Sequence, residues 1–207
     1  MPNNCVQAIV RLNRMRILII MAAFLSILSR LFGGEPSKPI YKTADAYDGL
    51  RKQILELKPE QLNTPTNQTV LALVMETGYP EAVATLVAVM DGSASLYFSN
   101  GGGIIGAGGN PEPNTAARKL VAKAAEFQSA CTITTVFPLP AKDHTRFYII
   151  TPKGVLTSEA TEADLGNNRH RMSPLFHTAH ELLAQIRLTE EKKKAEPRGP
   201  ASASPPR

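Results

Sequence analysis

Cysteine and tryptophan are the residue types that this sequence has least of. Its 207 residues include two cysteines, Cys5 and Cys131, and no tryptophan. Two distant cysteines form neither a disulfide framework nor a zinc-type spacing, so those two classes of small domain are excluded. The glycines follow no three-residue period, which excludes a collagen-like fibre. With 43% hydrophobic residues, the chain still has enough apolar side chains for a globular core.

The body of the chain also lacks an excess of either charge, because the net charge of +5 comes from the two ends. Residues 1–34 carry four arginines and no acid, and residues 189–207 carry five basic and three acidic groups. Residues 35–188 hold 14 basic and 15 acidic side chains. A nucleic-acid-binding domain has a basic stripe on its folded face. None is visible here, so we expect no nucleic-acid partner.

Long hydrophobic runs are limited to one, the uncharged residues 17–29, which follow Arg11, Arg14 and Arg16. A positive region before a short apolar run is typical of a secretory signal, but a small-residue cleavage site is lacking. The run is shorter than the roughly 20 apolar residues of a spanning helix. A start at Met15 or Met21 would instead leave an amphipathic helix able to lie on a membrane surface.

We interpret residues 1–34 as a basic and apolar leader and residues 35–43, which follow Gly33 and Gly34 and include Pro36 and Pro39, as a linker. The sequence leaves four roles open for the leader: a membrane anchor, a surface helix, a cleaved export signal or a helix packed on its own domain. The first two predict a cytoplasmic protein held at a membrane, and the third predicts export. The candidate anchor residues are Ile17, Leu18, Ile19, Ile20, Phe24, Leu25, Leu28, Leu31 and Phe32.

Residues 44–188 carry the periodic patterns of a single folded domain. Apolar side chains recur at helical spacing over residues 44–58, 114–130 and 173–188, and we expect Asn114 and Ser173 to cap the second and third helices. Residues 161–172 are expected to form a polar loop. Residues 189–207 contain a lysine run and a Pro/Ser/Ala ending, which predict a disordered tail.

Strand patterns fill the intervals between these helices. Runs over residues 69–76, 82–90 and 93–99 predict a three-stranded antiparallel meander, whose second turn is the hairpin signal Asp91-Gly92. The second run is apolar on both sides, so we place that strand inside the sheet with both faces covered. A β-prone stretch, residues 132–137, precedes a second hairpin over residues 145–159.

The sequence therefore predicts an α+β domain, with an antiparallel sheet of five or six strands and helices at the N-terminus, middle and C-terminus. This order of elements resembles that of type III secretion chaperone-like and related small bacterial α+β domains. With one strand reassigned, it also resembles roadblock or profilin-like domains. The likeness is one of topology, and no motif of either family carries a functional residue over to this chain.

The glycine-rich stretch from Asn100 to Asn110 is the first candidate site. Gly101, Gly103 and Gly106 match the G-x-G-x-x-G spacing of phosphate-binding loops, in which glycine lets the backbone approach an anion. The strand–turn–helix context and a nearby lysine are missing, so a purely geometric role is the alternative. Arg169 and Arg171, just before a helix start, are further candidates for binding a carboxylate or phosphate.

The second candidate is a metal site on the last predicted helix. His177, His180 and Glu181 share one helix face. The motif is not H-E-x-x-H, and His170, the next nearest imidazole, lies between two arginines. We therefore expect no bound metal, with His180 beside the apolar stripe and His177 in solvent.

The function that we expect is a non-enzymatic protein-interaction module, adaptor-like or chaperone-like and associated with a membrane through its N-terminus. Its partner would be another protein or a second copy. We expect no catalytic residue and no cofactor. The alternative is a binding protein or enzyme for an anionic small molecule, such as a phosphate, nucleotide or carboxylate, that uses the glycine stretch and the two arginines.

Overall fold

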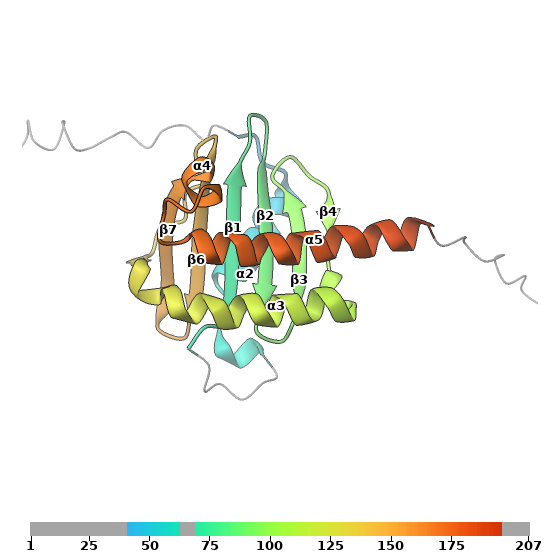
Figure 1. Cartoon of the computed structure of the whole chain (residues 1–207), viewed down its shortest axis with the longest axis horizontal. Helices are drawn as coiled ribbons and strands as arrows, with labels where there is room; N and C mark the ends of the chain where they lie inside the picture. Colours follow the sequence, from blue (N-terminus) through green and yellow to red (C-terminus); the bar gives the residue numbers. More distant parts are fainter. Residues whose placement is uncertain (1–40, 63–68, 196–207) are drawn as a thin grey trace, which may run out of the picture. The chain divides into compact units, whose positions relative to one another are not determined.

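The computed structural model describes residues 41–62 and 69–195, which form one sheet with helices on both faces. Helices α3 (Pro111–Ala124) and α5 (Ser173–Ala195) lie across one face, and α2 (Asp45–Leu55) lies behind the sheet on the other (Figure 1). One short helix, α4 (Glu162–Gly166), follows the last hairpin. Single turns of 3-10 helix cover Pro59–Gln61 (η1) and Ala107–Gly109 (η2), and a longer one covers Ala125–Ala130 (η3).

The sheet has the strand order β4-β3-β2-β1-β6-β7-β5, and every neighbouring pair is antiparallel. The central strand β1 pairs on one side with β2 and on the other with β6, so one ladder joins the first meander to the later hairpin. The strands are β1 (Ala72–Gly78), β2 (Val83–Val89), β3 (Ala94–Phe98), β4 (Gly103–Ile104), β5 (Thr132–Thr134), β6 (His144–Thr151) and β7 (Gly154–Thr161).

The predicted α+β class, the antiparallel meander and the second hairpin are confirmed, and the strand count is slightly higher than predicted. The extra strand is β4, two residues inside the glycine stretch that we expected to be a connection. Strand β2 lies inside the sheet as expected, and apolar residues cover both of its faces.

Three local predictions are corrected. Helix α3 begins at Pro111 rather than after Asn114, because the fixed φ of proline suits the first helical position, and Asn114 instead donates its amide to the carbonyl of Gly108. The expected loop 161–172 contains α4, capped by Thr161, whose Oγ1 accepts a hydrogen bond from the amide of Asp164 at 3.1 Å.

The third correction concerns the expected disordered tail, because α5 continues past Leu188 to Ala195. Strong helix formers fill this stretch, and Lys193 pairs with Glu190 at 3.1 Å one turn earlier. Three lysines in the last turn also complement the helix dipole. Residues 196–207, and the whole leader with its candidate anchor residues, lie outside the described residues.

Alternation along the strands separates two apolar clusters. The larger one fills the space between the sheet and helices α3 and α5, where Leu73, Phe147 and Leu182 are among the fully enclosed side chains. The smaller one lies between the sheet and α2, and includes Val74 and Tyr148. Because period-2 alternation sends neighbouring residues to opposite faces, the two clusters use the same strands without sharing a strand residue.

Candidate functional site

A row of polar side chains crosses the sheet on the face that carries α2. Register places Tyr97, Thr85, Glu76, Arg146 and Glu159 opposite one another on five adjacent strands, from β3 to β7. Directly opposed residues of an antiparallel pair point to the same face. Glu76 stands in the middle of this row and is fully buried.

Helix α2 neutralises the buried carboxylate of Glu76 with Arg51. The Arg51 Nε donates to one carboxylate oxygen at 2.7 Å and Nη2 donates to the other at 2.9 Å. Burial lowers the pKa of Arg51, but the hydrogen bond and charge of Glu76 outweigh it and raise the pKa overall. Such a two-pronged pair is geometrically specific, so it fixes where α2 sits along the sheet.

Two tyrosine side chains, Tyr47 and Tyr148, flank this ion pair. The hydroxyl of Tyr47 lies 3.0 Å from that of Thr85 and 3.4 Å from Glu76, and burial raises its pKa well above the usual range. The Arg51 guanidinium also lies over the ring of Tyr148 at 5.7 Å from the centroid. The carboxylate is therefore enclosed and already bound on both oxygens, which makes the cluster an anchor for α2 rather than a general base.

Beside this anchor, an apolar hollow of about 220 Å³ opens between α2 and strands β2 and β3. We call it the α2 groove. Its wall on the sheet includes Val87 and Val89, which are 7% and 8% exposed. The rim is polar, with Gln53, Asp91 and Ser95, and Ile105 stands at the edge with 59% of its surface exposed. The remaining lining residues are Leu50, Ile54, Leu57, Leu62 and Tyr97.

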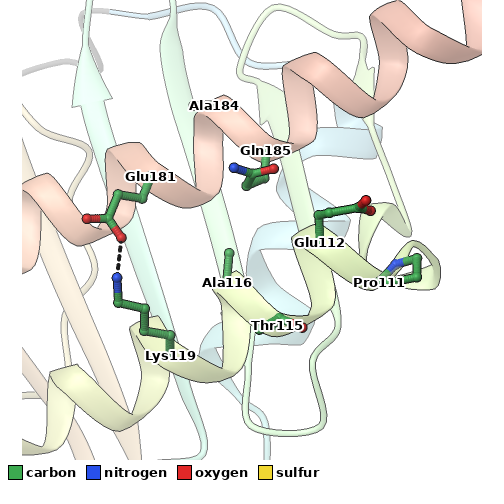
Figure 2. Close-up of a pocket in the computed structure, with 8 residues that line it drawn as sticks. All are labelled: Pro111, Glu112, Thr115, Ala116, Lys119, Glu181, Ala184 and Gln185. Atoms are coloured by element: carbon green, nitrogen blue, oxygen red, sulfur yellow. Dashed lines mark hydrogen bonds and ion pairs between the residues drawn. The ribbon is translucent and has the colours of Figure 1, made fainter.

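A second hollow, of about 650 Å³, lies between α3 and α5 on the opposite face of the sheet. Figure 2 shows Lys119 and Glu181 pointing toward each other across it, 2.5 Å apart, with Gln185 between the helices. Both charged side chains are more than half exposed, so their pair contributes little to stability. The hollow is open rather than enclosed, and charged or polar residues make up five of its eight lining residues: Glu112, Thr115, Lys119, Glu181 and Gln185.

The glycine candidates turn out to shape the backbone at one edge of the sheet. Gly101, Gly103 and Gly106 all have positive φ, at 105°, 144° and 74°. Gly103 pairs with Tyr97 in the β3–β4 ladder, and a Cβ there would approach the carbonyl oxygen of Leu96 to 2.5 Å. These contacts explain the glycines through geometry.

Arg169 and Arg171 are engaged elsewhere in the molecule. Arg169 pairs with Asp164 of α4 at 2.9 Å, and Arg171 donates to the carbonyl of Ser129 at 3.1 Å. Helix α4 follows β7, and five strand spacings of about 4.8 Å each separate β7 from β4 in the sheet order. The structure therefore does not bring the glycine stretch and the arginines into one anion site.

The two histidine candidates, His177 and His180, contact different residues. His177 is exposed and contacts Asn168 at 3.0 Å, whereas half-buried His180 lies against the ring of Phe176. Burial, followed by the nearby charges of His177 and Arg187, lowers the pKa of His180. Glu181 forms an ion pair with Lys119. Across residues 41–62 and 69–195, no group of three or more His, Cys, Asp or Glu residues is placed to hold a metal ion.

Sequence analysis missed Glu76, Arg51 and Ile105 as functional candidates. A signal existed for Glu76, because its strand neighbours on the same face, Ala72 and Val74, are apolar. Its partner Arg51 lies on a separate element, 25 residues earlier, so no local pattern links the two. Ile104 packs against the larger cluster, whereas Ile105, one residue past the end of β4, is exposed.

Among the described residues, no helix is both long and apolar enough to cross a membrane. Comparison of the chain with protein-family models, with curated proteins and with solved structures finds no match.

Proposed function

We propose that this chain is a non-enzymatic protein-interaction module and that its partner docks in the α2 groove. The observation that carries the proposal is an aliphatic hollow left open beside a helix that is rigidly anchored by Arg51 and Glu76. Small-molecule pockets are usually about 300–1,000 Å³, so a hollow of about 220 Å³ suits an anchoring side chain of a partner protein better than a whole ligand.

The chemistry of the remaining reactive groups agrees with a binding role. Burial raises the pKa of the Cys131 thiol to about 11, with a smaller opposing effect of Arg171. A thiol with so high a pKa is a poor nucleophile at neutral pH. The buried carboxylate of Glu76 is held on both oxygens. Neither group is available for chemistry as the structure stands.

A photo-crosslinking amino acid placed at Gln53, on the exposed rim of the α2 groove, tests the docking surface. The matched control is the same amino acid at Thr115, an exposed residue of the α3–α5 hollow. In the full chain in its native cells, we expect a discrete crosslinked species from Gln53 and none from Thr115. The same product from both positions, or none from Gln53, contradicts the proposal.

We further propose that the leader holds the module at a membrane. The support is sequence alone: the uncharged run 17–29 after three arginines, which lies outside the described residues. Fractionation of the full chain against a chain that begins at Glu35 tests this. We expect the full chain in the membrane fraction and the shorter one in the soluble fraction. Equal distribution of the two contradicts membrane attachment.

A further inference from the structure

We propose that the partner in the α2 groove is a second copy of this chain, with Ile105 of each copy inserted into the groove of the other. The proposal rests on the proposed function of the groove and adds the identity of its occupant. A projection and a hollow on one surface allow a two-fold, self-complementary interface, in which each copy contributes one of each.

The pleat of the sheet explains why Ile105 faces this side. Ile104 pairs with Leu96 in the β3–β4 ladder and packs against the core under α3 and α5. The next residue therefore points to the opposite face, where Ile105 reaches the rim of the α2 groove. Gly106 then takes the left-handed conformation, with φ at 74°, and turns the chain away. The isoleucine is thus presented at a turn instead of being folded into the domain.

The size of the groove suits this side chain. An apolar cavity of about 150 Å³ accepts a benzene molecule. The α2 groove, at about 220 Å³, therefore has room for one branched aliphatic side chain. Its aliphatic walls, which include Leu50, Ile54 and Val87, would exclude water from that side chain on binding.

Charge does not oppose a second copy. The projecting stretch, residues 100–110, carries no charged residue. Among the residues that line the groove, Asp91 is the one charged side chain, and it lies at the rim. Inserting an uncharged projection into this lining buries no unpaired charge, a penalty that would otherwise oppose association.

Other exposed apolar side chains of the described residues fit the groove less well. Leu188, which is 49% exposed, lies on α5 next to Arg187 and close to Glu190 and Glu191. Ile133, which is 71% exposed, belongs to β5 at the far edge of the sheet from β4. Leu188 lies one turn of α5 after Ala184 and Gln185, which line the charged α3–α5 hollow, and Ile133 lines neither hollow described above.

The expected dimer is weak. The groove is lined by eleven residues, whereas a standard interface uses about 20–30 residues on each side. An interface below this size is typical of transient complexes, so we expect self-association only as the concentration enters the micromolar range.

Sedimentation velocity of the full chain over a concentration series, to about 100 µM, tests the inference. We expect a reversible monomer–dimer equilibrium in the wild-type protein. Ile105→Asp should weaken it by at least about tenfold, because it places a charge in an apolar pocket. Ile133→Asp is the matched control, since it adds the same charge at the opposite edge, and it should leave the equilibrium unchanged.

Mixing two variants gives a sharper test. Ile54→Glu places a carboxylate in the wall of the groove, and Ile105→Asp places one on the projection. Each variant alone should therefore be monomeric. A mixed pair retains one intact projection and one groove whose aliphatic walls are intact and which is changed only at its edge, where Ile105 stands, so it should associate partly. Circular dichroism checks that both variants fold. Recovery in the mixture supports the reciprocal contact, whereas dimerisation of Ile105→Asp at wild-type strength, or equal loss in Ile133→Asp, overturns it.

The same measurements separate this inference from the proposed function. A wild-type chain that stays monomeric throughout, together with a crosslink from Gln53 to a different protein, overturns the second copy but keeps the docking surface. The absence of both self-association and any Gln53 crosslink overturns the two proposals together.

Discussion

The two faces of the sheet are built from the same strands but differ in polarity and in how far helices cover them. The face under α3 and α5 is apolar along β1 and β6, with Leu73, Met75 and Phe147 all at most 3% exposed. The face under α2 has the polar row through Glu76 and then the open α2 groove. Helix α2 has 11 residues, compared with 14 for α3 and 23 for α5, and covers correspondingly less of its face.

The comparison shows how one sheet supports two faces of different construction. Two long helices close one face with aliphatic contacts, which are strong but not directional. A short helix cannot cover the other face, and its position depends on directional contacts to Glu76. The uncovered remainder of that face is the α2 groove.

The largest expected effect is on the anchor of α2. Arg51→Met leaves the fully buried carboxylate of Glu76 without its cation, which should lower the free energy of unfolding by about 3–5 kcal/mol. Urea unfolding measures this. The double variant Arg51→Met/Glu76→Leu removes both charges and should regain most of the loss. A single variant as stable as the wild type would show that the α2 face does not depend on this pair.

Truncating one leucine on each face compares them directly. Leu182→Ala, under α5, should lower the free energy of unfolding by about 2–5 kcal/mol, because the residue is fully enclosed. Leu57→Ala, in the partly open α2 groove, leaves less cavity and should cost about 1 kcal/mol. Chemical unfolding of both variants checks the order. Equal losses would mean that the groove is as well packed as the main core.

Alanine substitutions at Gly103 and Gly106 test the backbone geometry beside the α2 groove. An alanine Cβ at Gly103 would come within 2.6 Å of the Cα of Tyr97, on top of the strain of a positive φ. At Gly106 a Cβ meets open space, so only the left-handed strain of about 1–2 kcal/mol remains. We expect a fall in melting temperature of about 2–4 °C per kcal/mol, larger for Gly103→Ala.

A thermal-shift screen of nucleotides, phosphates and carboxylates is the control for these glycine variants. Neither substitution should change the response to an anion, because both glycines serve backbone geometry. An anion that stabilises the wild type, with its effect lost in a variant of unchanged melting temperature, would restore the anion-binding interpretation of the stretch.

The smallest effect concerns an unpaired hydroxyl on the α2 face. Tyr97 is 4% exposed, and its hydroxyl finds no hydrogen-bond partner among the described residues. Tyr97→Phe removes that buried polar group and should raise the free energy of unfolding by up to about 1 kcal/mol. Thermal unfolding measures the change. A loss of stability instead would indicate that the hydroxyl is satisfied in solution.

Local patterns in the sequence predicted much of the fold. The Asp91-Gly92 turn was predicted from its residue types, and the structure confirms it: Gly92 has a φ of 91° and Asp91 accepts the amide of Ser93. Helix α5 was also predicted from its apolar spacing, and it begins at Ser173 as expected, although Ser173 is its first residue rather than the residue before it. These elements follow from contacts within a few residues, which is the range over which periodicity and turn chemistry act.

Features that depend on distant contacts could not be predicted in the same way. The pairing of β1 with β6, and the meeting of Arg51 with Glu76, join elements far apart in the chain. The G-x-G-x-x-G spacing of Gly101, Gly103 and Gly106 was visible, but its meaning depended on whether a strand formed there. The structure shows that Ile104 of this stretch packs against the core, whereas Ile105 is exposed at the rim of the α2 groove.

The single ladder between β1 and β6 has a consequence for how the chain folds. It joins residues 72–77 to residues 145–150, whereas the meander and the β6–β7 hairpin close over short loops. Because closing a long loop costs more conformational entropy, we expect each hairpin unit to form before the two halves of the sheet meet. The amides of β1 that bond to β6 should therefore become protected from hydrogen exchange late in refolding, after those of β2 and β3.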